Sequence, residues 1–139
     1  MSSIDSAAAA ALVSDAISRA QTDGVGVSIA VVDEAGSLVV FHRMAGAPRF
    51  SADFAIAKAR TSAAFSVPTS NLEELYKDRP AFAHSFVAQG SYFLGRGGMP
   101  IFSDGSLVGA IGVSGATAHG EEVLAIDVVE AADGFTAVA

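Results

Sequence analysis

The chain has 139 residues and no cysteine, so its length predicts one domain over residues 1–139 and disulfides and thiolate metal sites are excluded. Hydrophobic residues make up 51% of the sequence, which excludes disorder, yet every apolar stretch is broken before 18 residues, so we expect no membrane partner. The formal charge of −7, from 8 Lys and Arg against 15 Asp and Glu, argues against a nucleic-acid partner.

The first predicted element is a helix over residues 5–23, which ends at Gly24. Its apolar residues, among them Val13 and Ile17, share one stripe at helical spacing. The helix has acidic neighbours and no basic region of the kind that opens a signal peptide. We therefore expect a cytoplasmic location.

Two β-branched segments follow this helix. They span residues 25–32 and 37–44 and flank a turn that contains Gly36, a pattern that predicts a hairpin. A second helix is predicted from about Ser51, and Pro68 stops it.

Two short helices are predicted in the middle of the chain. We expect Ser70 to cap the first, with Glu73 completing a capping box. Pro80 opens the second, which extends to about Ala88. A short strand is predicted over residues 90–94.

The C-terminal part predicts a second hairpin and a last helix. The hairpin strands span residues 99–102 and 107–113, and the helix spans residues 120–132 with Thr117 as its cap. The predicted order is α-ββ-ααα-βββ-α. Consecutive hairpins make the sheet antiparallel, so the fold class is α+β, an antiparallel sheet with flanking helices.

The densest chemical signal is a glycine-rich segment. Gly109 and Gly112 interrupt a strand of Val and Ile residues, which indicates that another group approaches the backbone closely. Ser114 and Gly115 then lead into the last helix, where free backbone N–H groups favour an anion. The alternative is a simple turn capped by Thr117 that binds no ligand.

A locally positive segment stands out in this acidic chain and suits a carboxylate. It contains Arg43, Arg49, Lys58 and Arg60. Lys58 lies among alanines, so we expect partial burial, and a desolvated lysine acts as a base or nucleophile. The alternative is a solvated helix face paired with acids such as Asp53. Phe41, Phe50 and Phe54 are expected to line an apolar pocket beside this segment.

The three histidines, His42, His84 and His119, fit no zinc signature. His119 is the best placed, because it lies at the start of the last helix beside Glu121 and Glu122. Both glutamates suit the first turn of a helix. Either one can instead serve as a general base or orient a ligand.

A set of motifs covers the chain from about residue 8 to residue 132. The motifs are residues 41–48, 57–65, 68–70, 97–101 and 109–115. With them the sequence resembles the GlcG/HbpS family of haem-binding-type domains, a domain that also forms the C-terminal part of PduO-type cobalamin adenosyltransferases. The resemblance implies a profilin-like layered fold, homo-oligomers from dimers up to octamers, and haem binding or the turnover of a small molecule.

Three functions are therefore expected. The first is a haem-binding or haem-handling protein with His119 as a candidate iron ligand. The second is an enzyme that acts on a small carboxylated substrate of a catabolic pathway by proton transfer or hydrolysis, with Lys58, Glu122 and His119 as catalytic residues. The ligand-binding residues are expected to be Arg43, Arg60, Phe54, Gly97, Gly98, Ser114 and Gly115. The third is a non-catalytic structural or regulatory oligomer, which the excess of apolar over charged residues also favours.

Overall fold

The structure is a computed structural model that describes residues 3–139. Its elements, in chain order, are α1 (Ser6–Asp23), β1 (Ser28–Asp33), β2 (Leu38–Arg43), α2 (Ser51–Phe65), α3 (Thr69–Leu75), α4 (Pro80–Ala88), β3 (Gly98–Ser103), β4 (Ser106–Ser114) and α5 (Ala118–Ala131). The predicted α+β class is confirmed.

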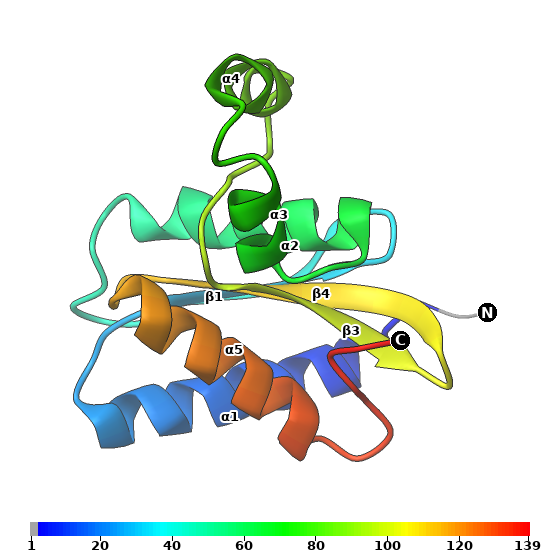
Figure 1. Ribbon diagram of the computed structural model, residues 1–139. Helices are drawn as coiled ribbons and strands as arrows, with labels where there is room; N and C mark the ends of the chain where they lie inside the picture. Colours follow the sequence, from blue (N-terminus) through cyan, green and yellow to red (C-terminus); the bar gives the residue numbers. More distant parts are fainter. Residues whose placement is uncertain (1–2) are drawn as a thin grey trace.

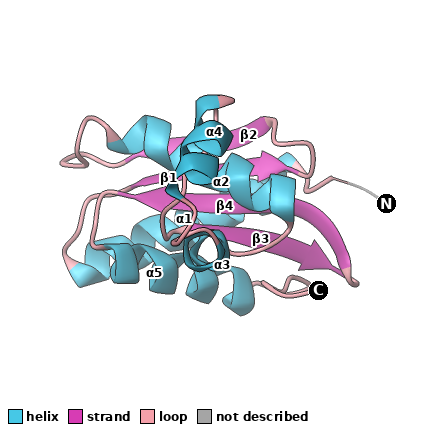
Figure 2. Cartoon of the chain, turned by 45° about the horizontal axis from the view of Figure 1, so that its top comes forward, coloured by secondary structure: helices cyan, strands magenta, loops and turns pink. Residues whose placement is uncertain are grey.

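The four strands form one antiparallel sheet in the order β2-β1-β4-β3 (Figure 2). Each hairpin contributes an edge strand and a central strand, and the two central strands pair along their length. Ile29 of β1 lies opposite Val113 of β4, and Ser28 lies opposite Ser114. The end of β4 that carries the glycine turn is therefore in the middle of the sheet, next to the start of β1.

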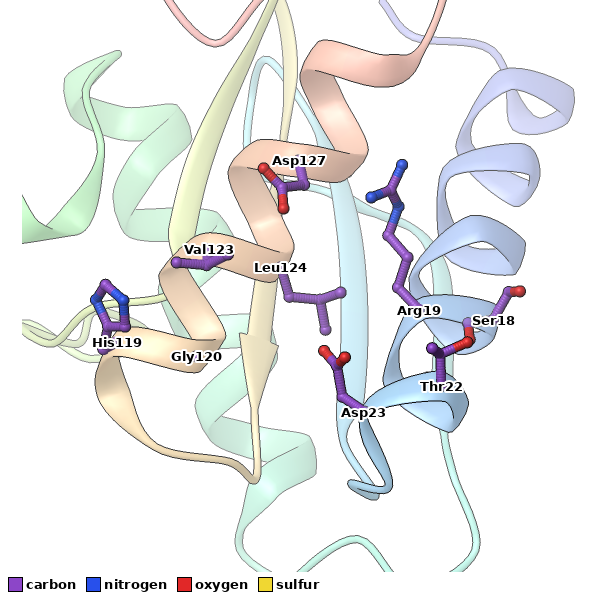
Figure 3. A pocket seen from close by; sticks show the side chains of 9 residues that line it. All are labelled: Ser18, Arg19, Thr22, Asp23, His119, Gly120, Val123, Leu124 and Asp127. Atoms are coloured by element: carbon purple, nitrogen blue, oxygen red, sulfur yellow. The ribbon is translucent and has the colours of Figure 1, made fainter.

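Helices cover both faces of the sheet (Figure 1). Helices α2 and α3 lie on one face, α1 and α5 lie on the other, and α4 stands away from the sheet. Helices α1 and α5 pack side by side, as the close-up in Figure 3 also shows. Within residues 3–139, no helix combines the length and the hydropathy that a membrane span requires.

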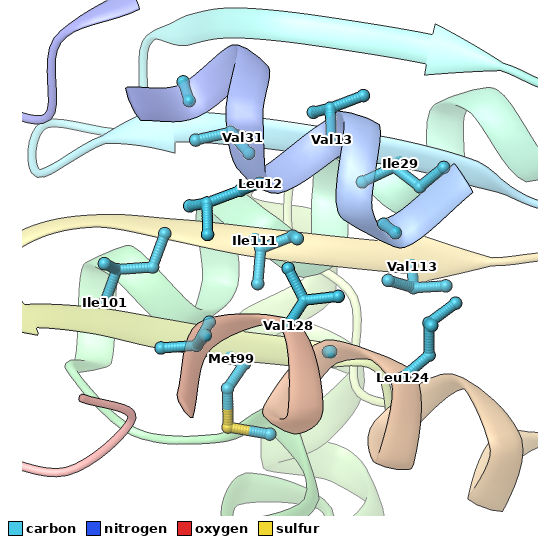
Figure 4. Close-up of a cluster of buried hydrophobic side chains, with 14 of the residues drawn as sticks. Leu12, Val13, Ile29, Val31, Met99, Ile101, Ile111, Val113, Leu124 and Val128 are labelled. Carbon is cyan, nitrogen blue, oxygen red and sulfur yellow. The ribbon is translucent and has the colours of Figure 1, made fainter. Parts of the chain in front are cut away.

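The two faces of the sheet carry side chains of different size, because successive residues of a strand point to opposite faces. Large apolar side chains face α1 and α5 and form the main core (Figure 4). They include Ile29, Val31, Met99, Ile101, Ile111 and Val113. Small side chains such as Ala30 and Ala110 face α2, which itself presents alanines.

Glycines on this second face let α2 approach the sheet backbone closely. A Cβ atom at Gly112 would collide with the carbonyl oxygen of Ala55, and one at Gly98 would lie 2.5 Å from the carbonyl oxygen of Lys58. The close approach predicted at Gly109 and Gly112 is confirmed, and the approaching groups are the protein's own backbone. The result is a helix held directly against the strands, with Lys58 at its inner surface.

Helix ends agree with the sequence at most positions. Asp5 caps α1 by accepting a hydrogen bond from Ala8 N at 2.7 Å, and Thr117 caps α5 by accepting from Gly120 N at 3.0 Å. The predicted capping box at Ser70 is wrong, because α3 begins at Thr69 and has no side-chain cap. The Thr69 hydroxyl instead accepts a hydrogen bond from Gly98 N at 2.9 Å, which ties α3 to the sheet.

The predicted strand over residues 90–94 is also wrong, since this segment is a turn followed by irregular backbone. Gly90 and Ser91 both have left-handed backbone angles, with φ values of 87° and 66°, which an extended strand does not accommodate. The chain then crosses α2, where Phe93 N donates to Thr61 Oγ1 at 2.8 Å. The segment therefore places Phe93 next to α2.

Candidate functional site

The centre of the candidate site is a buried ion pair between α2 and α5. Lys58 Nζ lies 2.9 Å from Glu121 Oε1 and donates a second hydrogen bond to the carbonyl oxygen of Val113 at 3.1 Å. The whole Lys58 residue is 3% exposed and Glu121 is 6% exposed. The predicted burial of Lys58 is therefore confirmed, and its partner is Glu121 rather than an acid of its own helix.

The second carboxylate oxygen of Glu121 is held by backbone. Oε2 accepts hydrogen bonds from Gly115 N at 2.8 Å and from Ala116 N at 3.1 Å. These are the N–H groups at the start of the last helix for which the sequence predicts an anion. The anion that they bind within the chain is the Glu121 carboxylate, so they do not face the site as free donors.

The local sequence explains how the pair is buried. Lys58 shares the inner face of α2 with the buried Ala55 and Ala59, and the spacing of Glu121 from Leu124 and Ala125 places it on the buried face of α5. Room for both side chains comes from Gly97. A Cβ atom there would lie 3.2 Å from the Cβ of Glu121 and 3.3 Å from the Cδ of Lys58. A side chain at position 97 would therefore press on both members of the pair.

A pocket of about 320 Å³ opens beside the ion pair. Lys58, Glu121 and the buried Ser114 line it, together with Arg96 and a group of aromatic side chains. Buried charged groups beside a cavity make it a candidate site for a ligand.

Three phenylalanines form the aromatic wall of this pocket. The rings of Phe54 and Phe93 are stacked with centroids 4.6 Å apart, and Phe50 lies against Phe54 at 5.1 Å. Lys58 Nζ is 5.5 Å from the centroid of the Phe93 ring, a cation–π distance. The expected aromatic lining by Phe50 and Phe54 is present, whereas Phe41 does not line this pocket.

The predicted positive segment is divided in space. Lys58 reaches the glycine-lined end of β4, but Arg60 lines a neighbouring pocket of about 420 Å³ on the other side of Phe54 and Phe93. Arg60 donates to the carbonyl oxygen of Gly36 at 3.2 Å and to Ser91 Oγ at 3.3 Å. Arg43 is exposed on β2 and donates to the carbonyl oxygen of Ala47 at 3.4 Å.

The glycines and the glutamate that were predicted as site residues do not line the pocket. Gly97 packs against both side chains of the ion pair, Gly98 packs against the Lys58 backbone, and Gly115 donates its N–H to Glu121. None of the three lines the pocket. Glu122 points elsewhere and lies 3.7 Å from Arg96 Nη1. The glutamate that pairs with Lys58 is its neighbour Glu121, whereas the expected catalytic glutamate was Glu122.

His119 belongs to a second pocket, of about 400 Å³, between α1 and α5 (Figure 3). Arg19 and Asp23 of α1 and Val123, Leu124 and Asp127 of α5 complete its lining. His119 is exposed and lies on the same side of α5 as Val123. Within residues 3–139, no group of three His, Cys, Asp or Glu side chains is arranged to hold a bare metal ion.

Sequence reasoning missed Phe93 and Arg96 and chose the neighbour of Glu121. A signal for Glu121 is present, because it precedes Leu124 and Val128 by three and seven residues and so lies on the apolar stripe of the last helix. A carboxylate on such a stripe requires a buried partner. Nothing local marks Phe93, which reaches the site from a segment predicted to be a strand.

Comparisons with known proteins agree with this architecture. A family model described as "Haem degrading protein HbpS-like" matches residues 4–130. Protein GlcG of Escherichia coli (strain K12) is 34% identical over 107 residues, which are 76% of this chain and 77% of that protein. The crystal structure of the PduOC:haem complex has a TM-score of 0.89 at 26% identity and covers 99% of both chains. A double mutant of Streptomyces reticuli HbpS has a TM-score of 0.85 at 31% identity, over 94% of this chain and 88% of that one.

Proposed function

Because the chain belongs to the family of HbpS-like haem-degrading proteins, we propose that it binds haem. One observation carries the proposal: the fold matches a domain crystallised with haem at a TM-score of 0.89 over 99% of both chains. The match includes the helices and the sheet that form both candidate pockets. This match supports haem binding by the domain as a whole. The position of haem within the domain is inferred from the side chains of this chain that can bind iron.

The combination of an imidazole and a cation favours the pocket between α1 and α5, since the pocket lined by His84 has no charged side chain. Haem iron is held in proteins by His, Cys, Met or Tyr side chains, and His119 supplies an imidazole at that pocket. Arg19 lines the same pocket and can pair with a propionate group, although it also contacts Asp15 at 3.0 Å. The pocket beside Lys58 offers no such iron donor among its lining residues, and the Lys58 amine is already held by Glu121 and Val113.

The outer surface of α5 supplies apolar contact for a flat macrocycle. Val123 and Ile126 are exposed, and they follow His119 by four and seven residues, so the three share one face of the helix. When bound, haem would supply an iron centre whose reactivity depends on its axial ligand and on solvent access. In this proposal His119 holds the iron, Val123 and Ile126 cover the ring, and Arg19 faces a propionate.

Titration of the purified protein with haem, followed by the Soret band, tests the proposal. We expect a shifted Soret band that saturates near one haem per chain. The His119→Ala variant should lose the spectrum of the His-ligated iron, whereas the His42→Ala variant, altered on the distant strand β2, should retain it. A wild-type protein without a shift at stoichiometric haem would overturn the proposal.

His84 provides a second control, since it lines a separate apolar pocket on α4 with Val87 and Leu94. If His84→Ala removes the His-ligated spectrum and His119→Ala does not, the role of His119 as ligand is rejected although haem binding stands. The alternative functions, an enzyme acting on a small carboxylated substrate and a non-catalytic structural oligomer, stay predictions. So do the cytoplasmic location and the assembly from dimer to octamer.

A further inference from the structure

The pocket beside Lys58 has an aromatic wall that takes no part in the proposed haem binding at His119. Phe50 is 56% exposed and Phe54 is 36% exposed, and both line the pocket with Phe93. Exposed aromatic rings that are already stacked offer a flat apolar surface to a ligand. A planar ring placed against them gains both buried area and favourable ring–ring geometry.

Two cations line the pocket next to these rings, and Lys58 Nζ lies 5.5 Å from the centroid of the Phe93 ring. A lysine ammonium has three N–H donors, and the hydrogen bonds of Lys58 within the chain use two of them, to Glu121 and Val113. Arg96 lines the same pocket, and its contacts with Glu73 and Glu122 are long, at 3.9 and 3.7 Å. Both side chains therefore have donor capacity for an oxygen atom of a ligand.

The acidic groups of the pocket limit the charge of that ligand. Both oxygens of Glu121 accept hydrogen bonds from within the chain, so its charge is balanced by Lys58 and two backbone N–H groups. Glu73 also lines the pocket and is exposed. A second carboxylate on the ligand would meet this glutamate, which favours a single negative charge.

From these contacts we infer that the pocket beside the Lys58–Glu121 pair is a second binding site, for a small aromatic monocarboxylate. The ring lies against Phe54 and Phe93, and the carboxylate faces Lys58 and Arg96. A volume of about 320 Å³ suits a ligand with one ring. The site is separate from the pocket of His119, which shares no lining residue with it.

Three probes separate the contributions of ring and charge. Benzoate has both features, cyclohexanecarboxylate keeps the charge without the flat ring, and benzyl alcohol keeps the ring without the charge. Calorimetric titration of the haem-free protein should show benzoate binding at least about tenfold more tightly than either other probe. Equal affinity for all three, or no benzoate binding at concentrations up to about 10 mM, would overturn the inference.

Two variants at exposed or half-buried positions test the assigned contacts without removing the buried ion pair. Phe93→Leu removes the ring that stacks on Phe54, and Arg96→Gln removes the second cation; each should weaken benzoate binding about tenfold. Arg79→Gln is the matched control, because Arg79 is exposed on the approach to α4 and lies over Phe82. Unchanged affinity in both test variants would contradict the site, as would an equal loss in the control.

A competition experiment distinguishes this site from the haem site. Saturating the protein with haem should leave the benzoate affinity unchanged, since the two pockets share no residue. Displacement of benzoate by haem would contradict the assignment of two sites. Because the first titrations use haem-free protein, absence of haem binding would leave the benzoate result intact.

Discussion

The ammonium nitrogen of Lys58 lies 2.9 Å from Oε1 of Glu121, although the two residues are 63 positions apart and belong to helices that cover opposite faces of the sheet (Figure 1). The contact passes around the end of β4, where Lys58 also bonds the carbonyl oxygen of Val113. One ion pair therefore joins both helical layers to the central strand.

Replacing Lys58 by Met should destabilise the protein by about 3–5 kcal/mol, because it leaves the Glu121 carboxylate buried without its cation. The free energy of unfolding from urea titrations, followed by circular dichroism, measures the loss. The double variant Lys58→Met with Glu121→Gln should recover a large part of it, since the uncompensated charge is then gone.

Lys77→Met is the control for this experiment. Lys77 pairs with Glu74 at 2.6 Å, but both side chains are exposed, so the change in unfolding free energy should stay below about 1 kcal/mol. Similar losses for Lys58→Met and Lys77→Met would show that burial does not govern the contribution of the Lys58 pair.

Gly112→Ala should destabilise the protein by about 3 kcal/mol, because the new methyl group meets the backbone of Ala55 and Ala59 in α2. Gly24→Ala is the matched control. Gly24 has a φ of 72°, and a methyl group added there would meet no atom within 4 Å, so only backbone strain of about 1 kcal/mol applies. Thermal and urea unfolding compare the two, and an equal loss would argue against crowding under α2.

Thr117→Ala should cost about 1 kcal/mol of unfolding free energy, because it removes the side-chain cap that accepts from Gly120 N. Thr22→Ala provides the comparison, since the Thr22 hydroxyl bonds Ser18 O inside α1 and alanine is the better helix former. We expect no loss there. A Thr117→Ala variant as stable as the parent in urea would contradict the capping role.

Homo-oligomer formation stays a prediction that light scattering can check. The exposed large apolar side chains include Leu38, Phe50, Leu75 and Val138. Exposed apolar surface of this kind favours burial in an interface between subunits. Size-exclusion chromatography with light scattering at micromolar concentration should give a multiple of the 14.0 kDa chain mass. A mass of one chain would contradict the prediction.

The fold was largely predictable because its signals are local. Alternating β-branched residues, the turn with Gly36 and the cap at Thr117 each act within a few positions. The two errors arise where a distant contact prevails. Helix α3 begins at Thr69, whose hydroxyl accepts a hydrogen bond from Gly98 N, and Ser70 does not cap it. The segment predicted as a strand bends, and its Phe93 N donates to Thr61 Oγ1.

The site was predictable only in part, since it is assembled from four separate segments. The alanines around Lys58 indicated its burial, and the glycines of β4 indicated a close approach. Adjacent residues of a helix point about 100° apart. Whether Glu121 or Glu122 faces Lys58 therefore depends on how α5 is rotated about its axis against the sheet. Arg60 is separated from Lys58 because residues two positions apart on a helix point about 200° apart, a separation that the predicted helix from Ser51 already implies.

The hydrogen bonds from Gly115 and Ala116 to Glu121 have a consequence for selectivity. Adjacent N–H groups at the start of a helix commonly bind phosphate esters. Here the Glu121 carboxylate, which is paired with Lys58, accepts the hydrogen bonds from these N–H groups. The N–H groups of Gly115 and Ala116 are therefore not available as donors to the phosphate group of a nucleotide or sugar phosphate.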